Sequence, residues 1–129
     1  MTSRPKRAYV RSKTLREAYR RIPCMWDRCG IEDGTVCCAH SNWSEHGKGG
    51  HIKADDSRGA ALCSTHHAAL DQGSTMAYEE RKAGWTDAHH RSVRILLGDG
   101  LWPKSIPVPA DAAGERYVLW YTPKGYTFV

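Results

Sequence analysis

With 129 residues, 40% hydrophobic and 26% charged, the chain has the length and composition of one folded domain, which excludes a disordered polypeptide. No run of about 18 apolar residues occurs, and the basic, polar N-terminus lacks the apolar centre of a signal peptide. We therefore expect no membrane partner and a reducing cytoplasm, where clustered cysteines are more often metal ligands than disulfides.

The net charge of +5 originates near the N-terminus. Residues 1–28 hold nine Lys or Arg against Glu17 and Asp27, whereas the rest of the chain is slightly acidic. A basic arm suits a polyphosphate partner because neutralising phosphates releases counterions. We expect this partner to be a nucleic acid. The alternative is a solvated tail that only aids solubility.

Apolar periodicity and turn residues predict short elements joined by polar loops. In chain order they are a helix over 15–21 capped by Thr14, a strand over 35–40, a Gly-rich loop over 41–59, a strand over 60–62, a helix over 64–71, and a helix over 76–97 that is open to a break at Gly84. Three prolines predict an extended tail over 101–115. A Pro-Lys-Gly turn predicts a C-terminal hairpin that could pair across a homodimer.

Two pairs of candidate metal ligands flank the predicted strands: Cys24 and Cys29 in CMWDRC, then Cys63 and His66 in CSTH. Three thiolates and one imidazole suit a closed, structural zinc site. The C-x₂-H spacing favours His66 as the fourth ligand, although His67 could replace it. Because a domain of this size is stable by only ~5–15 kcal/mol, we expect zinc loss to unfold it. The alternative, ordinary buried cysteines, accounts less well for the paired spacing.

Histidines near the predicted strands indicate a catalytic site. Phosphodiester hydrolysis needs an activated water and charge stabilisation at the phosphate. His40 could supply the base, and His67 could help hold a divalent ion that keeps positions open for phosphate and water. The alternatives are a hydrogen-bonded core histidine for His40 and a zinc or surface role for His67. Cys37 and Cys38 face opposite ways on a strand, so we expect core packing for them.

The stretch AHSNWSEHGKGGHIKADDSRGAALCSTHHAALDQG resembles the phage and prophage nucleases of the YbcO type. It is also similar to the recombination nuclease Ref and, more distantly, to HNH and endonuclease VII-like enzymes. The resemblance covers about residues 22–98. The motifs that carry it are Ala39-His40, Gly47-Lys48-Gly49, Lys53 to Asp56, and Cys63, His66 and His67 followed by Asp71.

This resemblance implies an α+β fold, a small treble-clef zinc domain with a ββα-metal (HNH-like) core, to which the C-terminal β-hairpin is added. The expected organisation is a basic arm and short helix over 1–21, a zinc-bound nuclease domain over 22–98 and a tail with hairpin over 99–129. The implied function is a DNA endonuclease of phage or prophage recombination or processing, with structural Zn²⁺ and catalytic Mg²⁺ or Mn²⁺.

The resemblance also implies roles for individual residues. His40 is the catalytic base, and His67 with Asp56 or Asp71 holds the catalytic metal. Either aspartate could instead orient a histidine by accepting its N–H. Contacts to nucleic acid are expected from Lys48, Lys53 and Arg58.

The chain departs from the family pattern at two points. His66 stands where many relatives have Cys, and the middle Asn of HNH enzymes has no clear counterpart, since Asn42 is close to His40. The rival hypotheses are a non-catalytic, zinc-stabilised DNA-binding accessory module and a protein-interaction module. Neither of them needs the His40 and His67 pair.

Overall fold

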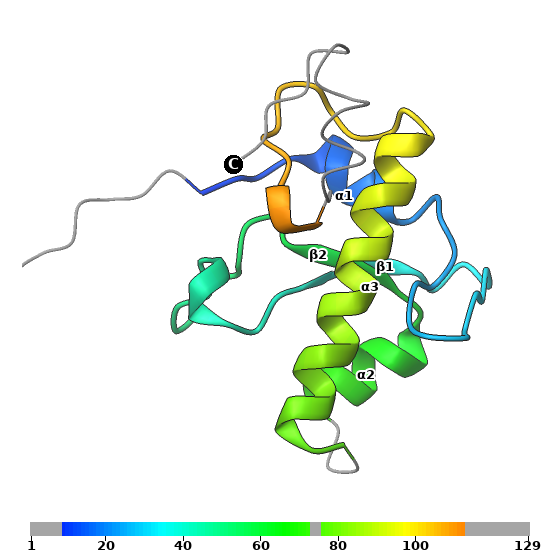
Figure 1. Cartoon of the computed structure of the whole chain (residues 1–129), viewed down its shortest axis with the longest axis vertical. Coiled ribbons are helices and arrows are strands. Elements are labelled where there is room, and N and C mark those ends of the chain that lie inside the picture. Colours follow the sequence, from blue (N-terminus) through cyan, green and yellow to red (C-terminus); the bar gives the residue numbers. More distant parts are fainter. Residues whose placement is uncertain (1–8, 73–75, 113–129) are drawn as a thin grey trace, which may run out of the picture.

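Two short strands, β1 (Cys37–His40) and β2 (Gly59–Leu62), pair as an antiparallel sheet. β2 is buried along its whole length, and Gly59 has no room for a side chain because a Cβ there would overlap Cys38 Sγ. Small residues in β2 therefore let its neighbours approach closely. The computed structural model describes residues 9–72 and 76–112 (Figure 1).

Helices surround this sheet and give an α+β domain, as predicted. α3 (Tyr78–Gly98) crosses the sheet against β2, α1 (Lys13–Tyr19) packs against β1, and α2 (Ser64–Gln72) follows β2. Figure 1 shows α1 and α2 behind opposite ends of α3. A 3-10 turn, η1 (Ser44–His46), lies in the loop between the strands. Among the described helices, none combines the length and the apolar character that a membrane span requires.

The first helix begins earlier than predicted, and Thr14 is not its cap. Ser12 caps α1, its Oγ accepting the Leu15 N–H at 3.1 Å. The backbone N–H of Ser12 donates in turn to Asp56 Oδ2 at 2.6 Å. A contact across the fold therefore selects the start of this helix, and local sequence does not reveal that contact.

β1 is shorter than the predicted strand over 35–40 because Thr35 is engaged elsewhere. Its N–H and hydroxyl both bind Asp33 Oδ1, and its Oγ1 accepts the Ser64 N–H at 3.0 Å. Thr35 therefore ends a turn and caps α2 instead of extending the strand.

The long C-terminal helix is continuous through Gly84, so the break considered there is absent. A Cβ at Gly84 would overlap the ring of Trp26. The glycine is thus explained by packing: it lets the tryptophan lie directly against the helix backbone.

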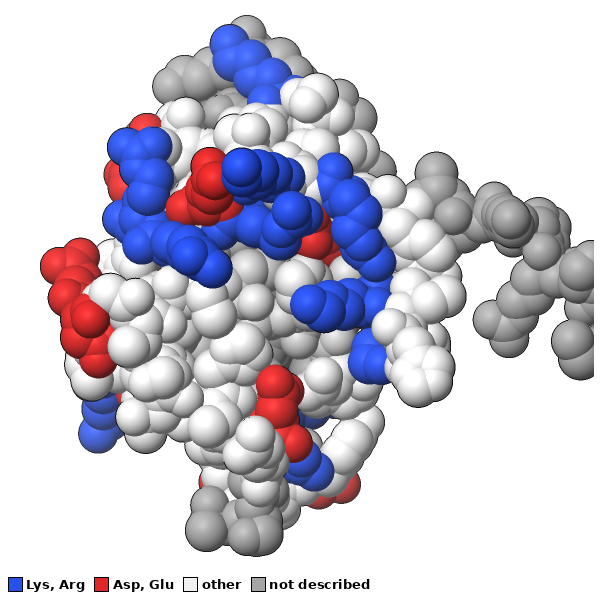
Figure 2. Space-filling model, turned by 180° about the vertical axis from the view of Figure 1, so that it is seen from behind, with Lys and Arg blue, Asp and Glu red and all other residues white. Residues whose placement is uncertain are grey.

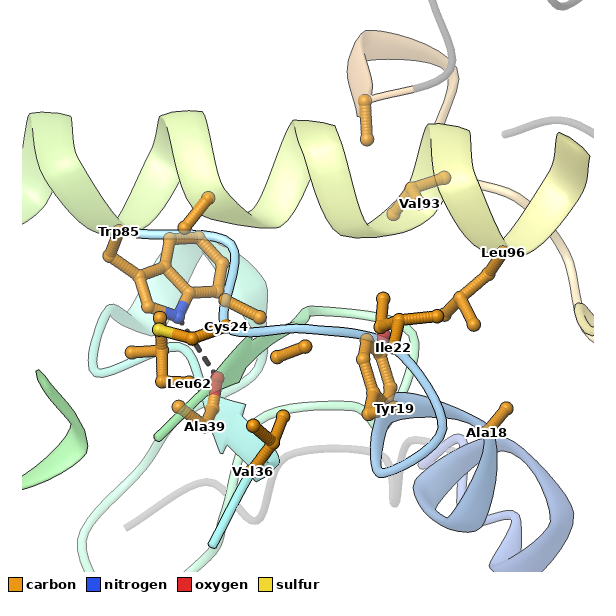
Figure 3. Close-up of a cluster of buried hydrophobic side chains, with 14 of the residues drawn as sticks. Ala18, Tyr19, Ile22, Cys24, Val36, Ala39, Leu62, Trp85, Val93 and Leu96 are labelled. Atoms are coloured by element: carbon orange, nitrogen blue, oxygen red, sulfur yellow. Dashed lines mark hydrogen bonds between the residues drawn. The ribbon is translucent and has the colours of Figure 1, made fainter. Parts of the chain in front are cut away.

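One hydrophobic core joins the three segments distinguished in the sequence. It includes Leu15 and Tyr19 of α1, most of the sheet, Trp85 of α3 and, after that helix, Trp102, Val108 and Ala112. Figure 3 shows part of this core, with Trp85 Nε1 donating to the Ala39 carbonyl at 3.0 Å.

The extended tail expected after the last helix is wrong for residues 101–112. The N–H of Ile106 binds the carbonyl of Pro103 at 3.1 Å in a turn, and residues 110–112 form a helical turn. Burial of Trp102 anchors this segment, and its Nε1 donates to the Ile106 carbonyl at 2.9 Å. The predicted C-terminal hairpin lies outside the described residues.

His89 makes stability depend on pH. Its buried ring donates Nδ1–H to the Gly59 carbonyl at 2.6 Å, and burial lowers its pKa to about 3. The unfolded chain therefore takes up a proton below about pH 6.5 that the folded chain does not accept. We expect the free energy of unfolding to fall between about pH 6.5 and 3, by up to about 1.4 kcal/mol per pH unit from this group. Urea titrations of wild type and His89→Gln test this, since equal pH slopes would contradict it.

Candidate functional site

Four ligands from distant parts of the chain meet at one point. The Sγ atoms of Cys24, Cys29 and Cys63 and a ring nitrogen of His66 all lie within 4.8 Å of one another. His66 Nδ1 is 3.6 Å from Cys24 Sγ and 3.4 Å from Cys63 Sγ. Three thiols and one imidazole are a donor set that could hold a metal ion such as zinc. The structure places His66, and not His67, with these three cysteines.

Backbone contacts explain how the first two ligands are presented. The segment from Cys24 to Gly30 folds back on itself, with Cys29 N–H on the Trp26 carbonyl and Gly30 N–H on the Cys24 carbonyl. Gly30 has a φ of +68°, which a residue with a side chain rarely adopts. The N–H of Met25 donates to the Ala61 carbonyl of β2 at 2.7 Å. The segment from Cys24 to Gly30, which we call the knuckle, is therefore attached directly to the sheet.

Trp26 joins this cluster to α3. Its indole stacks on the His66 ring, with centroids 5.4 Å apart and planes 12° apart. The indole also occupies the space where Gly84 would carry a Cβ. Trp26 therefore packs between Gly84 of α3 and the candidate ligand His66.

Gly84→Ala should destabilise the fold although alanine is the better helix former. Helix propensity favours alanine by ~1 kcal/mol, while displacing a packed ring costs ~1–3 kcal/mol. We expect a net loss of stability and weaker metal retention, measured by thermal unfolding and metal analysis. Ala83→Gly, at the exposed neighbouring position, should cost only the propensity difference and leave metal content unchanged. A more stable Gly84→Ala protein would contradict this packing account.

Metal content tests the four-residue cluster directly. We expect Cys63→Ser to lose a zinc ion that the wild-type chain retains through purification, since it removes one of four ligands. Cys37→Ser removes a cysteine outside the cluster and should leave the zinc content unchanged. Elemental analysis gives the measurement, and equal zinc content in the two variants would refute the assignment.

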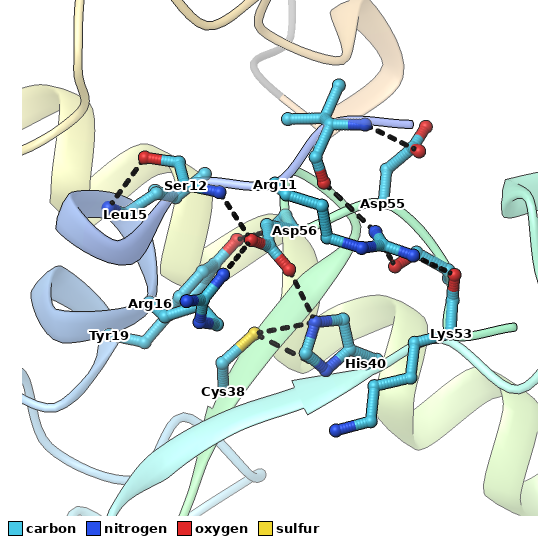
Figure 4. A network of polar contacts seen from close by, with 12 residues as sticks. Arg11, Ser12, Leu15, Arg16, Tyr19, Cys38, His40, Lys53, Asp55 and Asp56 are labelled. Carbon is cyan, nitrogen blue, oxygen red and sulfur yellow. Dashed lines mark hydrogen bonds and ion pairs between the residues drawn. The ribbon is translucent and has the colours of Figure 1, made fainter. Parts of the chain in front are cut away.

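A second group of polar contacts centres on Asp56. This carboxylate is 1% exposed, and its Oδ1 lies 2.7 Å from His40 Nε2. Its Oδ2 accepts both the Ser12 N–H and a guanidinium N–H of Arg16, each at 2.6 Å. The hydroxyl of Tyr19 donates to the Asp56 backbone carbonyl at 3.0 Å. Figure 4 shows the N-terminal segment and α1 converging on this one residue.

These contacts determine the charge of Asp56 and the orientation of His40. Burial raises the pKa of Asp56, but the hydrogen bonds from His40, Ser12 and Arg16 outweigh burial, so the pKa is lower than usual. The carboxylate is therefore ionised at neutral pH and accepts the Nε2–H of His40. The other ring nitrogen, Nδ1, then carries a lone pair; its one contact within the described residues is Cys38 Sγ at 4.0 Å.

A third group lies on α2. His67 Nε2 is 3.3 Å from Asp71 Oδ2, one helical turn away, and His67 Nδ1 is 3.3 Å from Cys37 Sγ. Asn42 donates to the other oxygen of Asp71 at 3.1 Å. The hydrogen bond from His67 lowers the pKa of Asp71, so this carboxylate is also ionised at neutral pH.

Both histidine groups line the same cleft, which has a volume of about 1110 Å³. Lys48 and Lys53, for which contacts to nucleic acid are predicted, also line it. Arg58, the third such residue, is not part of the lining, and its guanidinium pairs with Asp111 Oδ2 at 3.0 Å.

Sequence reasoning missed several residues that line this cleft or support it. Arg16 and Ser12 reach Asp56 across some forty positions, and no local pattern marks such a contact. Cys37 was expected to pack in the core but is half-buried and lines the cleft beside His67. Asn42, set aside for its closeness to His40, binds Asp71 instead.

Comparisons with protein-family models, with curated proteins and with solved structures each find no match to this chain. The class of protein is therefore defined by its own architecture: a small α+β domain with a Cys₃His cluster and a histidine-lined cleft. The resemblance to phage nucleases rests on the sequence motifs.

Proposed function

We propose that this chain is a divalent-metal-dependent DNA endonuclease, acting in recombination or processing of phage or prophage DNA. The observation that carries the proposal is that two histidines with different carboxylate partners lie at one cleft. His40 is paired with a buried carboxylate, and His67 is paired with an accessible one. The first pair suits a base, and the second suits a metal site.

The order of elements supports an HNH-like assignment of the fold. β1, β2 and α2 follow one another, as in a ββα-metal core, and His40 and His67 lie on its first strand and its helix. The Cys24 and Cys29 knuckle and the start of α2 meet at the metal cluster, as in a treble clef. We propose that zinc there is structural, because all four ligand positions are filled by the protein.

His40 is proposed as the general base. Asp56 accepts the Nε2–H, which fixes the tautomer and leaves Nδ1 to take a proton from a water molecule in the cleft. As the imidazole gains that proton, the nearby carboxylate stabilises the positive charge. Arg16 and Ser12 keep the carboxylate in place during this step.

His67 and Asp71 are proposed to hold Mg²⁺ or Mn²⁺. Asp71 offers a carboxylate oxygen, the ligand these hard ions prefer, and His67 adds a nitrogen; both side chains are partly exposed, 45% and 31%. When bound, the ion would polarise the phosphate and stabilise the leaving oxygen. Asn42 and Cys37 orient the pair, one on the carboxylate and the other on the imidazole.

His40→Ala should lower plasmid cleavage in Mg²⁺ or Mn²⁺ by about 10²–10⁴-fold, because a general base contributes about that much. His90→Ala removes a histidine outside the cleft and should cleave like the wild type. Gel assays under single-turnover conditions measure both rates. Equal rates for wild type and His40→Ala would show that His40 is not the base.

A non-catalytic DNA-binding module is the second candidate. It is favoured by one observation: within the described residues, the only group of three or more potential metal ligands is the Cys₃His cluster, so the His67 and Asp71 pair has no third protein ligand. In that case wild type and His40→Ala would bind DNA equally and neither would cleave it.

A further inference from the structure

The lining of the cleft carries many more cationic side chains than carboxylates. Among the described residues that line it, six are Lys or Arg and two are carboxylates, Glu17 and Asp71. Figure 2 shows Lys and Arg gathered on the side of the molecule away from α3. The cations come from α1 and its end, from the loop between the strands and from the first turn of α3: Lys13, Arg16, Arg20, Lys48, Lys53 and Arg81.

Three of these cations form a row along α1. Positions 13, 16 and 20 are three and four residues apart, so they share one face of a helix and span about 10 Å. That distance matches about three nucleotides of one DNA strand, which rises about 3.4 Å per nucleotide. Lys13 lies 3.9 Å from Glu17 and is 82% exposed, and Arg16 is bound to Asp56. Within the described residues Arg20 has no ion pair, so it is free for a ligand.

The cations lie around the same cleft as the two histidines. Arg20 lines it together with His67 and Cys37. Lys53 lines it together with His40, and Figure 4 includes both side chains.

Arg81 provides an independent indication of a ligand. Its Nε is buried and has no hydrogen-bond partner among the described residues, although the side chain lines the cleft. Among the described residues no carboxylate pairs with Arg81, so its positive charge is available to a phosphate in the cleft.

Apart from Lys and Arg, the described lining offers few groups that read bases. It has no Trp, Tyr or Phe on which a base could stack, and both its carboxamide and its hydroxyl are engaged, Asn42 by Asp71 and Ser41 by His46. We infer that the α1 row and the opposite loop bind the phosphate backbone of DNA across the two histidines without selecting base sequence. This inference rests on the proposed nuclease function and identifies its substrate as the sugar-phosphate backbone.

Neighbouring arginines offer a matched test. Arg20 lines the cleft, whereas Arg21 is exposed and does not. Anisotropy of labelled DNA duplexes, measured over a range of salt without added divalent ions, compares His40→Ala with the same protein carrying Arg20→Gln or Arg21→Gln. We expect Arg20→Gln to weaken binding about three- to tenfold for every sequence and to reduce the salt slope by about one. Arg21→Gln should change neither quantity.

Two results would overturn the inference: equal binding by Arg20→Gln and Arg21→Gln, or a preference of more than about tenfold among unrelated duplexes. Neither depends on cleavage. If the wild type fails to cut DNA but only Arg20→Gln weakens binding, the inference of phosphate-backbone binding stands and the nuclease proposal fails. Thermal unfolding of each variant verifies that the fold is retained.

Discussion

The buried carboxylate of Asp56 is the constraint on which the cleft depends. A charge that is 1% exposed is tolerated only with nearly every lone pair occupied, and here the partners are Ser12, Arg16 and His40. Meeting this requirement places the start of α1, the end of β1 and the loop before β2 in one arrangement. The same contacts orient the His40 ring, so the stability of the fold and the chemistry of the site share one origin.

The Cys₃His cluster provides the complementary constraint at the other end of β2, where Cys63 directly follows Leu62. It links the knuckle to the start of α2, while Trp26 extends the connection from His66 to α3 at Gly84. α2 is only partly supported by apolar packing, since Leu70 is its one buried residue. A metal held at its first turn would fix the helix and with it His67. The zinc proposal and the position of His67 are therefore connected physically.

Much of this architecture could be predicted because its determinants are local. The paired ligand spacing indicated the cluster, and the apolar periodicity indicated both strands and the long helix. The parts that were wrong depend on contacts between distant residues. Ser12 caps α1 because Asp56 binds it, Gly84 leaves the helix unbroken because Trp26 fills the space, and the chain after α3 turns back because Trp102 is buried.

The orientation of His40 depends on one tautomer, in which Nε2–H donates to Asp56 and Nδ1 carries the lone pair. Long-range ¹H–¹⁵N NMR of the histidine side chains, at a pH where His40 is neutral, measures this tautomer directly. We expect a protonated Nε2 and an unprotonated Nδ1 for His40 in the wild type, with loss of this preference in Asp56→Ala. A protonated Nδ1 in the wild-type protein would contradict it.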